Sequence, residues 1–531
     1  MKILDLIRRG VNRMGEKVDV FKKDIFELEG VPAFREYYTL FIFVWQAIYK
    51  GFYKDWHEIP IKTIKDPKGS KKRIMATLNA GPMACEQMAR YAWDEQCEIN
   101  VSTRGRNPDD KTPDPLNEFL HNVLTDNNFW DSFGDLLEKT FAMGGGALRE
   151  WVEIPKDKTG KDIGEGKIKI GYTIASQFVP TAWDKNRVNS GIFISREAKD
   201  GFYYTIVEWH HLDGTTYRVT NDLYRMPIKG TDEPQNILGW WYPLEKVYPV
   251  LSPDTKIENV ERAFFQYIKP FGANYADDNS PLGMSIYRRS LDTLHTSDII
   301  YDSFQREFVL GKKRIIAPSR AMKTVAGLNG GTPQRYFDAD DEVWEALSTD
   351  TNEDLKIQDN SVSLRIQEHV AGINANLAIF CSQIGFDPGT LSFDAVKGLK
   401  TATEVISENS KTFGTVKNHE NNIRGKLIDM VHAIIDLAVH YGLTYEGKKI
   451  ESLISSGYDV SVKFDDSIIQ DKDADINRGV MLVGAGLKSK KKFLTDEMGY
   501  TPEEADQEIA QIAAEKKNDT VTVSRLFGGM E

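Results

Sequence analysis

Apolar residues recur every three or four positions along the front of the chain, which is typical of helices with one buried face. Gly81 to Asp94 follows this spacing, and Pro115 to Phe141 repeats it. The range 36–56 is crowded with aromatic side chains, which indicates a hydrophobic core or a subunit contact. The run Gly144-Gly145-Gly146 should end a helix, because glycine accepts the backbone angles that close one. The front of the chain is therefore predicted to be mainly helical.

From Ala147 to Pro249 the pattern changes to short runs in which apolar and polar residues alternate. Turn-forming Gly, Asn, Asp and Pro residues separate these runs. The sequence predicts a β-rich insertion here, with strands at Ala147–Ile154, Lys167–Ile174, Gly191–Arg196 and Tyr203–His211.

Long helical patterns follow the β-rich insertion. Gly283 to Leu310 predicts one helix of about 40 Å, and Val362 to Ile384 predicts a second, with a small mixed module between them at 311–360. Lys400 to Tyr441 predicts a very long helix whose first half is polar. A helix without an apolar face usually crosses solvent or lies at a hydrated interface between subunits. We therefore expect the first half of this helix to face solvent or such a subunit seam.

The end of the chain carries weaker patterns. We expect a strand at Val460–Phe464 and three short helices at Asn477–Val483, Ser489–Met498 and Pro502–Glu515. The whole sequence therefore predicts an α+β fold that is mainly helical.

The composition limits the kinds of function that fit. With 531 residues, 41% of them hydrophobic, the chain is long enough for two to four cores. Its 79 acidic residues outnumber its 67 basic residues and give a net charge of −12. Because proteins that grip DNA through its phosphates are usually basic, any contact with DNA should be loose, local or repulsive.

Cysteine use, the N-terminal segment and the most apolar run of the chain point to a cytoplasmic protein without a membrane span. Cys85, Cys97 and Cys381 form no CxxC pair, so we expect neither a disulfide framework nor a cysteine zinc site. Met1–Lys17 fits an amphipathic helix better than a signal peptide, and the apolar run Thr39–Ile48 is too short to cross a bilayer.

No motif for a nucleotide or metal cofactor is complete. Gly398 to Thr401 contains GxKT but lacks the first glycine of a phosphate-binding loop. Asp471, Asp473 and Asp475 imitate the start of a calcium loop, yet Ile476 and Leu482 stand where glycine and glutamate are required. We therefore expect no cofactor and no metal.

The residue types of a metal-dependent nuclease motif are present, but they are far apart in the sequence. Pro108-Asp109 and Glu165-Gly166-Lys167 could supply the carboxylates and lysine of a metal-dependent nuclease, although both lie in predicted loops. This leaves a phage nuclease as an alternative function.

Two histidine groupings favour structural roles. Glu208, His210 and His211 resemble a metal triad, but strand alternation should send the two histidines to opposite faces. Cys381 and His369 lie too far apart along one helix to act together, and Cys381 falls on the apolar side. We therefore expect no catalytic residues.

Several local strings resemble the portal proteins of long-tailed phages of Gram-positive bacteria, and their order resembles them over nearly the whole chain. The strings are Pro281 to Tyr287, Asp298 with Tyr301 to Phe304, Lys400 to Val405, and Ala485 to Ser489. The resemblance implies a ring of twelve subunits at one capsid vertex, through which the genome enters and leaves.

The resemblance also implies a division of the chain. By this likeness residues 1–282 form a wing that includes the β-rich insertion 147–249, 283–310 and 361–385 form stem helices, 311–360 a clip, 386–399 a tunnel loop, 400–470 a long wing helix with a closing strand, and 471–531 a crown and tail.

Partners and candidate residues follow from the same resemblance. Implied partners are sliding double-stranded DNA, the terminase large subunit, the major capsid protein with its scaffold, and a head–tail connector. The implied location is the virion, with assembly in the host cytoplasm. Candidates for the tunnel loop are Lys397, Lys400 and Asp394, and candidates for partner binding at the clip are Lys312, Lys313, Arg314, Asp340 and Asp341. We expect Lys397 and Lys400 to face the channel, because they flank the turn-rich loop. Another head or tail structural protein is a further alternative.

Overall fold

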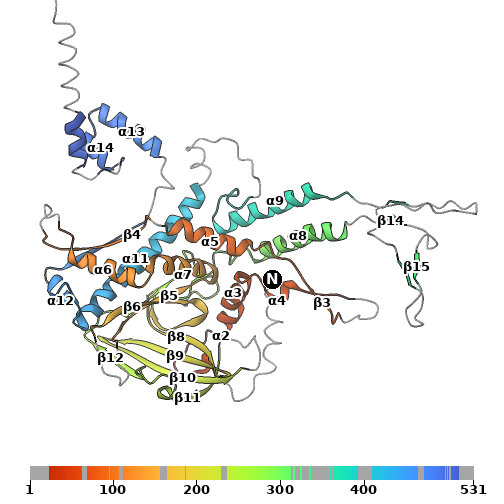
Figure 1. The fold of residues 1–531 in the computed structure, drawn as a ribbon, viewed down its shortest axis with the longest axis horizontal. Helices are drawn as coiled ribbons and strands as arrows, with labels where there is room; N and C mark the ends of the chain where they lie inside the picture. The colour runs from red at the N-terminus through yellow and green to blue at the C-terminus, as the bar shows by residue number, and fades with distance from the viewer. Residues whose placement is uncertain are drawn as a thin grey trace, which may run out of the picture.

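The fold combines a helical front part, two antiparallel sheets and a pair of helices that extends beside them (Figure 1). The computed structural model describes residues 23–62, 69–94, 96–106, 112–155, 164–185, 187–228, 236–311, 315–316, 323–325, 334–336, 358–359, 363–392, 410–464, 472–496, 498, 500 and 504–512. The expected mixed α+β class is confirmed.

Helices dominate the described part of the chain before residue 144, as expected. They are α2 (Arg35–Tyr37), the π-helical η3 (Tyr38–Ile42), α3 (Phe43–Tyr49), α4 (Lys54–His57), α5 (Ala80–Ala92), α6 (Pro115–Asp126) and α7 (Phe129–Met143), with the short η2 (Ile25–Glu27) before them. The aromatic stretch is largely core, since Trp45 and Tyr38 are at most 1% exposed. Asp114 caps α6 by accepting a 2.9 Å hydrogen bond from Leu116 N.

The glycine run ends α7 as predicted. Gly144 has φ +82° and its N–H donates to Thr140 O. A Cβ at Gly144 would lie 2.6 Å from Gly283 O, so the segment around Gly283 packs directly against this helix end. The position therefore requires glycine both for its backbone angles and for its space.

The larger sheet is antiparallel and runs in the order β1-β11-β10-β9-β8-β7, with β12 also paired to β10. Its strands are β1 (Lys23–Asp24), β7 (Phe178–Asp184), β8 (Arg187–Lys199), β9 (Phe202–Asp213), β10 (Thr216–Pro227), β11 (Ile237–Tyr242) and β12 (Asp254–Glu258). The three-residue helices η4 (Ala175–Gln177) and η5 (Leu244–Lys246) flank it.

The smaller sheet runs β13-β5-β6, with β5 (Gly146–Glu153), β6 (Lys167–Ile174) and β13 (Phe265–Ile268). The predicted β-rich insertion is thus confirmed. Its strands continue past residue 249, however, because β12 and β13 join sheets that began about forty or more residues earlier in the chain.

The first long helix is shorter than predicted. The helix α8 spans Leu291–Leu310, about 30 Å, and residues 281–290 are not helical. Their backbone is used by other elements: Ile286 N donates to Phe141 O, and Tyr37 Oη donates to Gly283 O at 2.9 Å. The apolar residues of this segment are buried although it is not helical: Leu282, Met284, Ile286 and Tyr287. The apolar pattern therefore reflects burial and not a helix here.

The second and third long helices are α9 (Ile366–Ile384) and α11 (Ser410–His440). We expected the polar half of the last one to face solvent or a subunit seam, and α11 is exposed on one face only, which carries Lys411, Asn418 and Asn421. Thr412, Phe413, Val416, His419 and Glu420 are buried. On the buried face, segments distant in the chain supply partners: Asp387 Oδ2 accepts from Thr412 Oγ1, and Phe271 N donates to His419 Nδ1.

The remaining described elements are small. They are β2 (Glu58–Pro60) with β3 (Lys72–Ile74), β4 (Glu98–Thr103) with β20 (Tyr458–Lys463), β14 (Ile315–Ile316) with β17 (Gln358–Asp359), β15 (Lys323–Val325) with β16 (Gln334–Tyr336), β18 (Thr444–Tyr445) with β19 (Lys448–Lys449), α12 (Ile450–Leu453), α13 (Lys472–Gly484), α14 (Lys490–Asp496) and a helix at 504–512. The expected closing strand and the three short helices are present. Asp473 and Asp475 belong to α13, which rules out the calcium-loop conformation there.

Candidate functional site: the paired helices α8 and α9

The helices α8 and α9 lie side by side and run in opposite directions (Figure 1). Near the start of α8, Thr293 Oγ1 donates to Gln383 Oε1 at 2.9 Å. Further along, Asn376 Nδ2 donates to Ser297 Oγ at 2.7 Å. Early residues of α8 thus meet late residues of α9, and these buried polar contacts fix the register of the pair.

The far end of the pair is closed by an ion pair. Arg365 Nη2 lies 2.9 Å from Glu307 Oε2, and Arg365 Nε lies 3.2 Å from Glu307 Oε1. The hydrogen bonds from Arg365 hold the pKa of Glu307 down, at about 2. Just beyond, Ile315 pairs with Asp359 and Ile316 with Gln358. The chain between α8 and α9 therefore leaves and returns at one place.

The near end of α8 is anchored to the front of the chain through Asp298. Its Oδ1 accepts from Thr77 Oγ1 and from Leu78 N, both at 2.8 Å. Its Oδ2 lies 3.3 Å from Nε2 of His57, which is 2% exposed. Burial lowers the pKa of His57, but its hydrogen bonds to Asp298 and to the Tyr53 backbone, together with the charge of Asp298, raise that pKa overall.

One turn further along α8, Asp302 completes the anchor. Arg73 grips it with two parallel hydrogen bonds of 2.8 Å, and Ala76 N donates to it at 3.2 Å. Burial alone would raise the pKa of Asp302, but the hydrogen bonds from Arg73 and Ala76 lower it overall. Two carboxylates spaced i and i+4 thus bind one face of α8 to the segment 73–78.

The opposite end of α9 meets the start of α11. Thr412 N and Oγ1 both donate to Asp387 Oδ2 at 2.9 Å, and Thr415 Oγ1 donates to Gly385 O at 2.7 Å. Gly385, with φ +90°, ends α9. These contacts therefore join the end of α9 to the start of α11.

Much of the α8–α9 pair is apolar surface. Within the pair, Leu294, Ile373, Leu377 and Phe380 are buried. Other apolar side chains of the pair and its ends are exposed: Ile299, Phe308, Val309, Leu310, Leu364, Ile366 and Ile379. Exposed apolar side chains in this number on one pair of helices are typical of surfaces that meet another protein.

The residues predicted from sequence to contact DNA or partners cannot be placed. All of them lie outside the described residues: Lys312, Lys313, Arg314, Asp340, Asp341, Asp394, Lys397 and Lys400. Asp298 and Asp302 were noticed only as part of a family-like string, and their anchoring role was missed. The sequence signal that could have indicated this role is the pair of acidic residues one turn apart within an apolar helical pattern.

The residues of the possible nuclease motif do not form a site in the described part of the chain. Glu165 accepts hydrogen bonds from Thr444 N and Oγ1 at 2.6 and 2.9 Å, which is a structural contact, and Asp109 lies outside the described residues. Over the described ranges no group of three or more His, Cys, Asp or Glu residues could hold a metal ion.

The opposite faces predicted for His210 and His211 and the burial predicted for Cys381 are confirmed. His210 is 5% exposed and contacts Glu208 and Tyr217, whereas His211 lies on the other face beside Ser190. Burial raises the pKa of Glu208, but the hydrogen bonds and charges of His210 and Arg149 together lower it to about 2. Cys381 is fully buried in the core.

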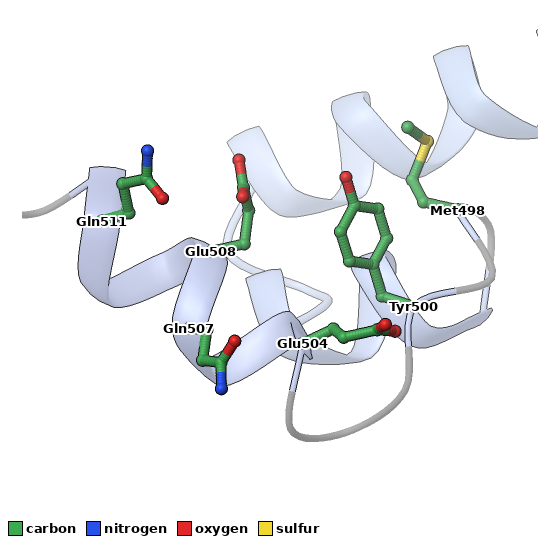
Figure 2. Close-up of a pocket in the computed structure, with 6 residues that line it drawn as sticks. All are labelled: Met498, Tyr500, Glu504, Gln507, Glu508 and Gln511. Atoms are coloured by element: carbon green, nitrogen blue, oxygen red, sulfur yellow. The ribbon is translucent and has the colours of Figure 1, made fainter.

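The hollow near the C-terminal helices is open and polar (Figure 2). It has a volume of ≈ 380 Å³ and is lined by Met498, Tyr500, Glu504, Gln507, Glu508 and Gln511. This lining lacks a nucleophile paired with a base, so it does not resemble an active site. In the described part of the chain, no helix is both long and apolar enough to cross a membrane.

Comparison with known proteins agrees with an architectural role. The family model described as phage portal protein, SPP1 Gp6-like, matches residues 42–521. No curated protein matches the chain. Portal proteins are structural components of the phage capsid that serve genome packaging, and they work as oligomers with capsid and terminase partners. Because the match spans most of the chain, this protein belongs to the phage portal protein family.

Proposed function

We propose that twelve copies of the chain close into a ring at one capsid vertex, with α8 and α9 as the stem around a DNA channel. The observation that carries this proposal is the apolar surface of the pair. Val309 is 63% exposed, Ile379 54% and Leu310 51% in a single copy. In a closed ring each copy covers this surface on its neighbour, which removes the cost of exposing it to water.

The ends of the pair support the rest of the division. The segment between α8 and α9 departs and returns at the Glu307–Arg365 ion pair, which suits a clip at 311–360 that projects from the stem. Figure 1 places β14 beyond this far end of the pair. The clip candidates Lys312, Lys313 and Arg314 directly follow this end in the sequence, where terminase and later the connector would bind.

The proposed tunnel loop has a comparable base. Asp387 lies at the start of the proposed tunnel loop 386–399, and its hydrogen bonds from Thr412 tie that start to α11. Lys397 and Lys400 then meet passing DNA, and the net charge of −12 keeps the rest of the channel from holding it tightly. The wing contacts the major capsid protein and scaffold, and the crown, 471–531, lies inside the head.

Electron microscopy of a matched pair of variants tests this function. Ile379→Asp places a charge on the exposed surface of α9, and we expect it to abolish annular particles while circular dichroism and melting stay near those of the unmodified protein. Ile379→Leu keeps the side chain apolar and should retain rings. Rings of unchanged number and size in Ile379→Asp would contradict the stem assignment.

A further inference from the structure

Two adjacent arginines just before the helix α8 lack acidic partners. Arg288 is half-buried and Arg289 is exposed. Within the described ranges neither of them forms an ion pair with an Asp or Glu side chain. Burial lowers the pKa of Arg288, and the positive charge of Arg289 lowers it further. The two charges therefore repel each other, and the described part of a single copy does not compensate them.

Both arginines are held in place by groups other than acids. Arg288 Nη1 donates to Ser285 O at 3.2 Å, and a Cβ added at Gly272 would lie 2.6 Å from Arg288 Nη2. The guanidinium of Arg289 lies 5.3 Å from the ring centroid of Tyr275, within the range of a cation–π contact. Side chains that are already fixed in this way lose less conformational entropy when they bind a carboxylate.

Exposed aromatic side chains lie on the loop that packs against these arginines. Phe271 and Tyr275 are 53% and 48% exposed. Tyr275 Oη donates to Arg288 O at 3.1 Å, and Phe271 N donates to His419 Nδ1 at 3.0 Å, which ties the loop to α11. We call Phe271, Tyr275, Arg288 and Arg289 the arginine–aromatic patch.

The composition of this patch favours a protein partner over DNA. Arg, Tyr and Phe are enriched at protein–protein contacts, whereas DNA phosphates are usually contacted by basic and other polar groups. An exposed Phe271 gains nothing from a phosphate, but it gains from burial against another protein. The uncompensated positive charges indicate that this protein presents carboxylates to the patch.

A second copy of the chain meets this requirement. Each copy has a net charge of −12, so a neighbouring copy carries more acidic than basic side chains. The patch also lies directly before α8, whose exposed Ile299 belongs to the apolar surface of the proposed stem. A contact between a basic patch on one copy and an acidic surface on the next is heterologous, and such contacts can close into rings.

We infer that the arginine–aromatic patch is a contact between subunits, in which Arg288 and Arg289 bind carboxylates of the neighbouring copy and Phe271 and Tyr275 are covered by it. This inference rests on the proposed ring. Bound carboxylates remove the repulsion between the two arginines. Closure of the ring then depends on these ion pairs as well as on the apolar surface of α8 and α9.

Charge reversal at Arg289, followed by electron microscopy, tests the contact. Because Arg289 is exposed, Arg289→Glu should leave the melting temperature of a single copy unchanged, yet it should reduce annular particles at least about tenfold. Arg289→Lys keeps the charge and should retain rings. Lys199→Glu is the matched control, because it makes the same change in net charge at an exposed position of β8, and it should also retain rings.

The outcomes separate this contact from the ring itself. Annular particles as numerous in Arg289→Glu as in Lys199→Glu would overturn the inference and leave the proposed ring standing. Loss of rings in Arg289→Glu together with rings in both other variants supports it. If the unmodified chain forms no rings, the proposed function and this inference both fail.

Photochemical crosslinking identifies what covers the patch. Replacing Phe271 with the photoreactive benzoylphenylalanine keeps an aromatic side chain that links to a neighbouring group when illuminated. Illuminated rings should give a ladder of linked copies on a denaturing gel, and illuminated single copies should not. Links only to DNA added to the rings, or no links between copies, would overturn the inference.

Discussion

The anchor between α8 and the segment 73–78 predicts a measurable loss of local stability in Asp302→Asn. The carboxylate of Asp302 is 10% exposed and Arg73 is 28% exposed, so the pair is shielded but not dry. A hydrogen bond to a charged group contributes about 1.5–3 kcal/mol. In the variant, water can hydrate the partly exposed Arg73 guanidinium, which offsets part of the lost stabilisation. We therefore expect about 2 kcal/mol, or about 30-fold in the equilibrium for local opening.

Hydrogen exchange of the segment 73–78 measures this effect. At neutral pH the amides of Ala76 and Leu78 should exchange about 30-fold faster in Asp302→Asn than in the unmodified chain. Asp292→Asn is the control, because Asp292 is an exposed acid in the first turn of the same helix and should change exchange there by less than about fivefold. Equal exchange in Asp302→Asn and the unmodified chain would refute the anchor.

The pH dependence of the same variant checks the cause. The folded-state pKa of Asp302 lies below its ordinary value of 3.8, so its stabilisation is fully present above about pH 5 and is lost as the pH falls through the folded-state pKa. The difference between Asp302→Asn and the unmodified chain should shrink accordingly. In a double-mutant cycle, Arg73→Met should couple with Asp302→Asn by about 1–3 kcal/mol. Additive effects would show that the two side chains act separately.

Three further outcomes are expected. Replacing both Lys397 and Lys400 with Glu should impair genome packaging in infected cells without preventing ring formation, and normal packaging would leave their channel position unsupported. Burial raises the pKa of Glu150 from 4.5 to about 8. Between these pH values the unfolded chain loses this proton while the folded chain keeps it, so the stability of the fold decreases as the pH rises. Glu150→Gln should therefore raise the melting temperature at pH 8 and much less at pH 5. Gly144→Ala should cost more than about 3 kcal/mol in denaturant titrations, because its Cβ would meet Gly283 O, whereas Gly105→Ala, with open space around it, should cost about 1 kcal/mol.

Local patterns were enough to predict most elements whose residues determine their own conformation. The strand at Lys167–Ile174 was predicted with the same bounds that the structure has. Successive side chains of a strand point to opposite faces, so a half-buried strand shows alternating apolar and polar residues in its own sequence. The helix end at Gly144 was predicted for the same kind of reason, since its backbone angles favour glycine. The opposite faces of His210 and His211 followed from strand alternation alone.

Patterns failed where distant segments supply the hydrogen bonds. Residues 283–290 look helical because they are apolar, yet Phe141 and Tyr37 take up their backbone groups and the helix starts only at Leu291. The first part of α11 looks solvated because it is polar, yet one of its faces is buried, where Phe271 N donates to His419 and Thr412 donates to Asp387. A sequence window does not contain the partner that decides such cases.

The sequence by itself determined the order of helices and strands, the acidic character of the chain and its likeness to phage portal proteins, because periodicity, charge and motif order are local properties. Only the tertiary structure decided that Asp298 and Asp302 anchor α8 and that Thr412 ties Asp387, at the start of the proposed tunnel loop, to α11. The physical reason is that the members of each of these contacts are separated by 25 to 229 residues in the chain and become neighbours only when the two sheets and the long helices pack together.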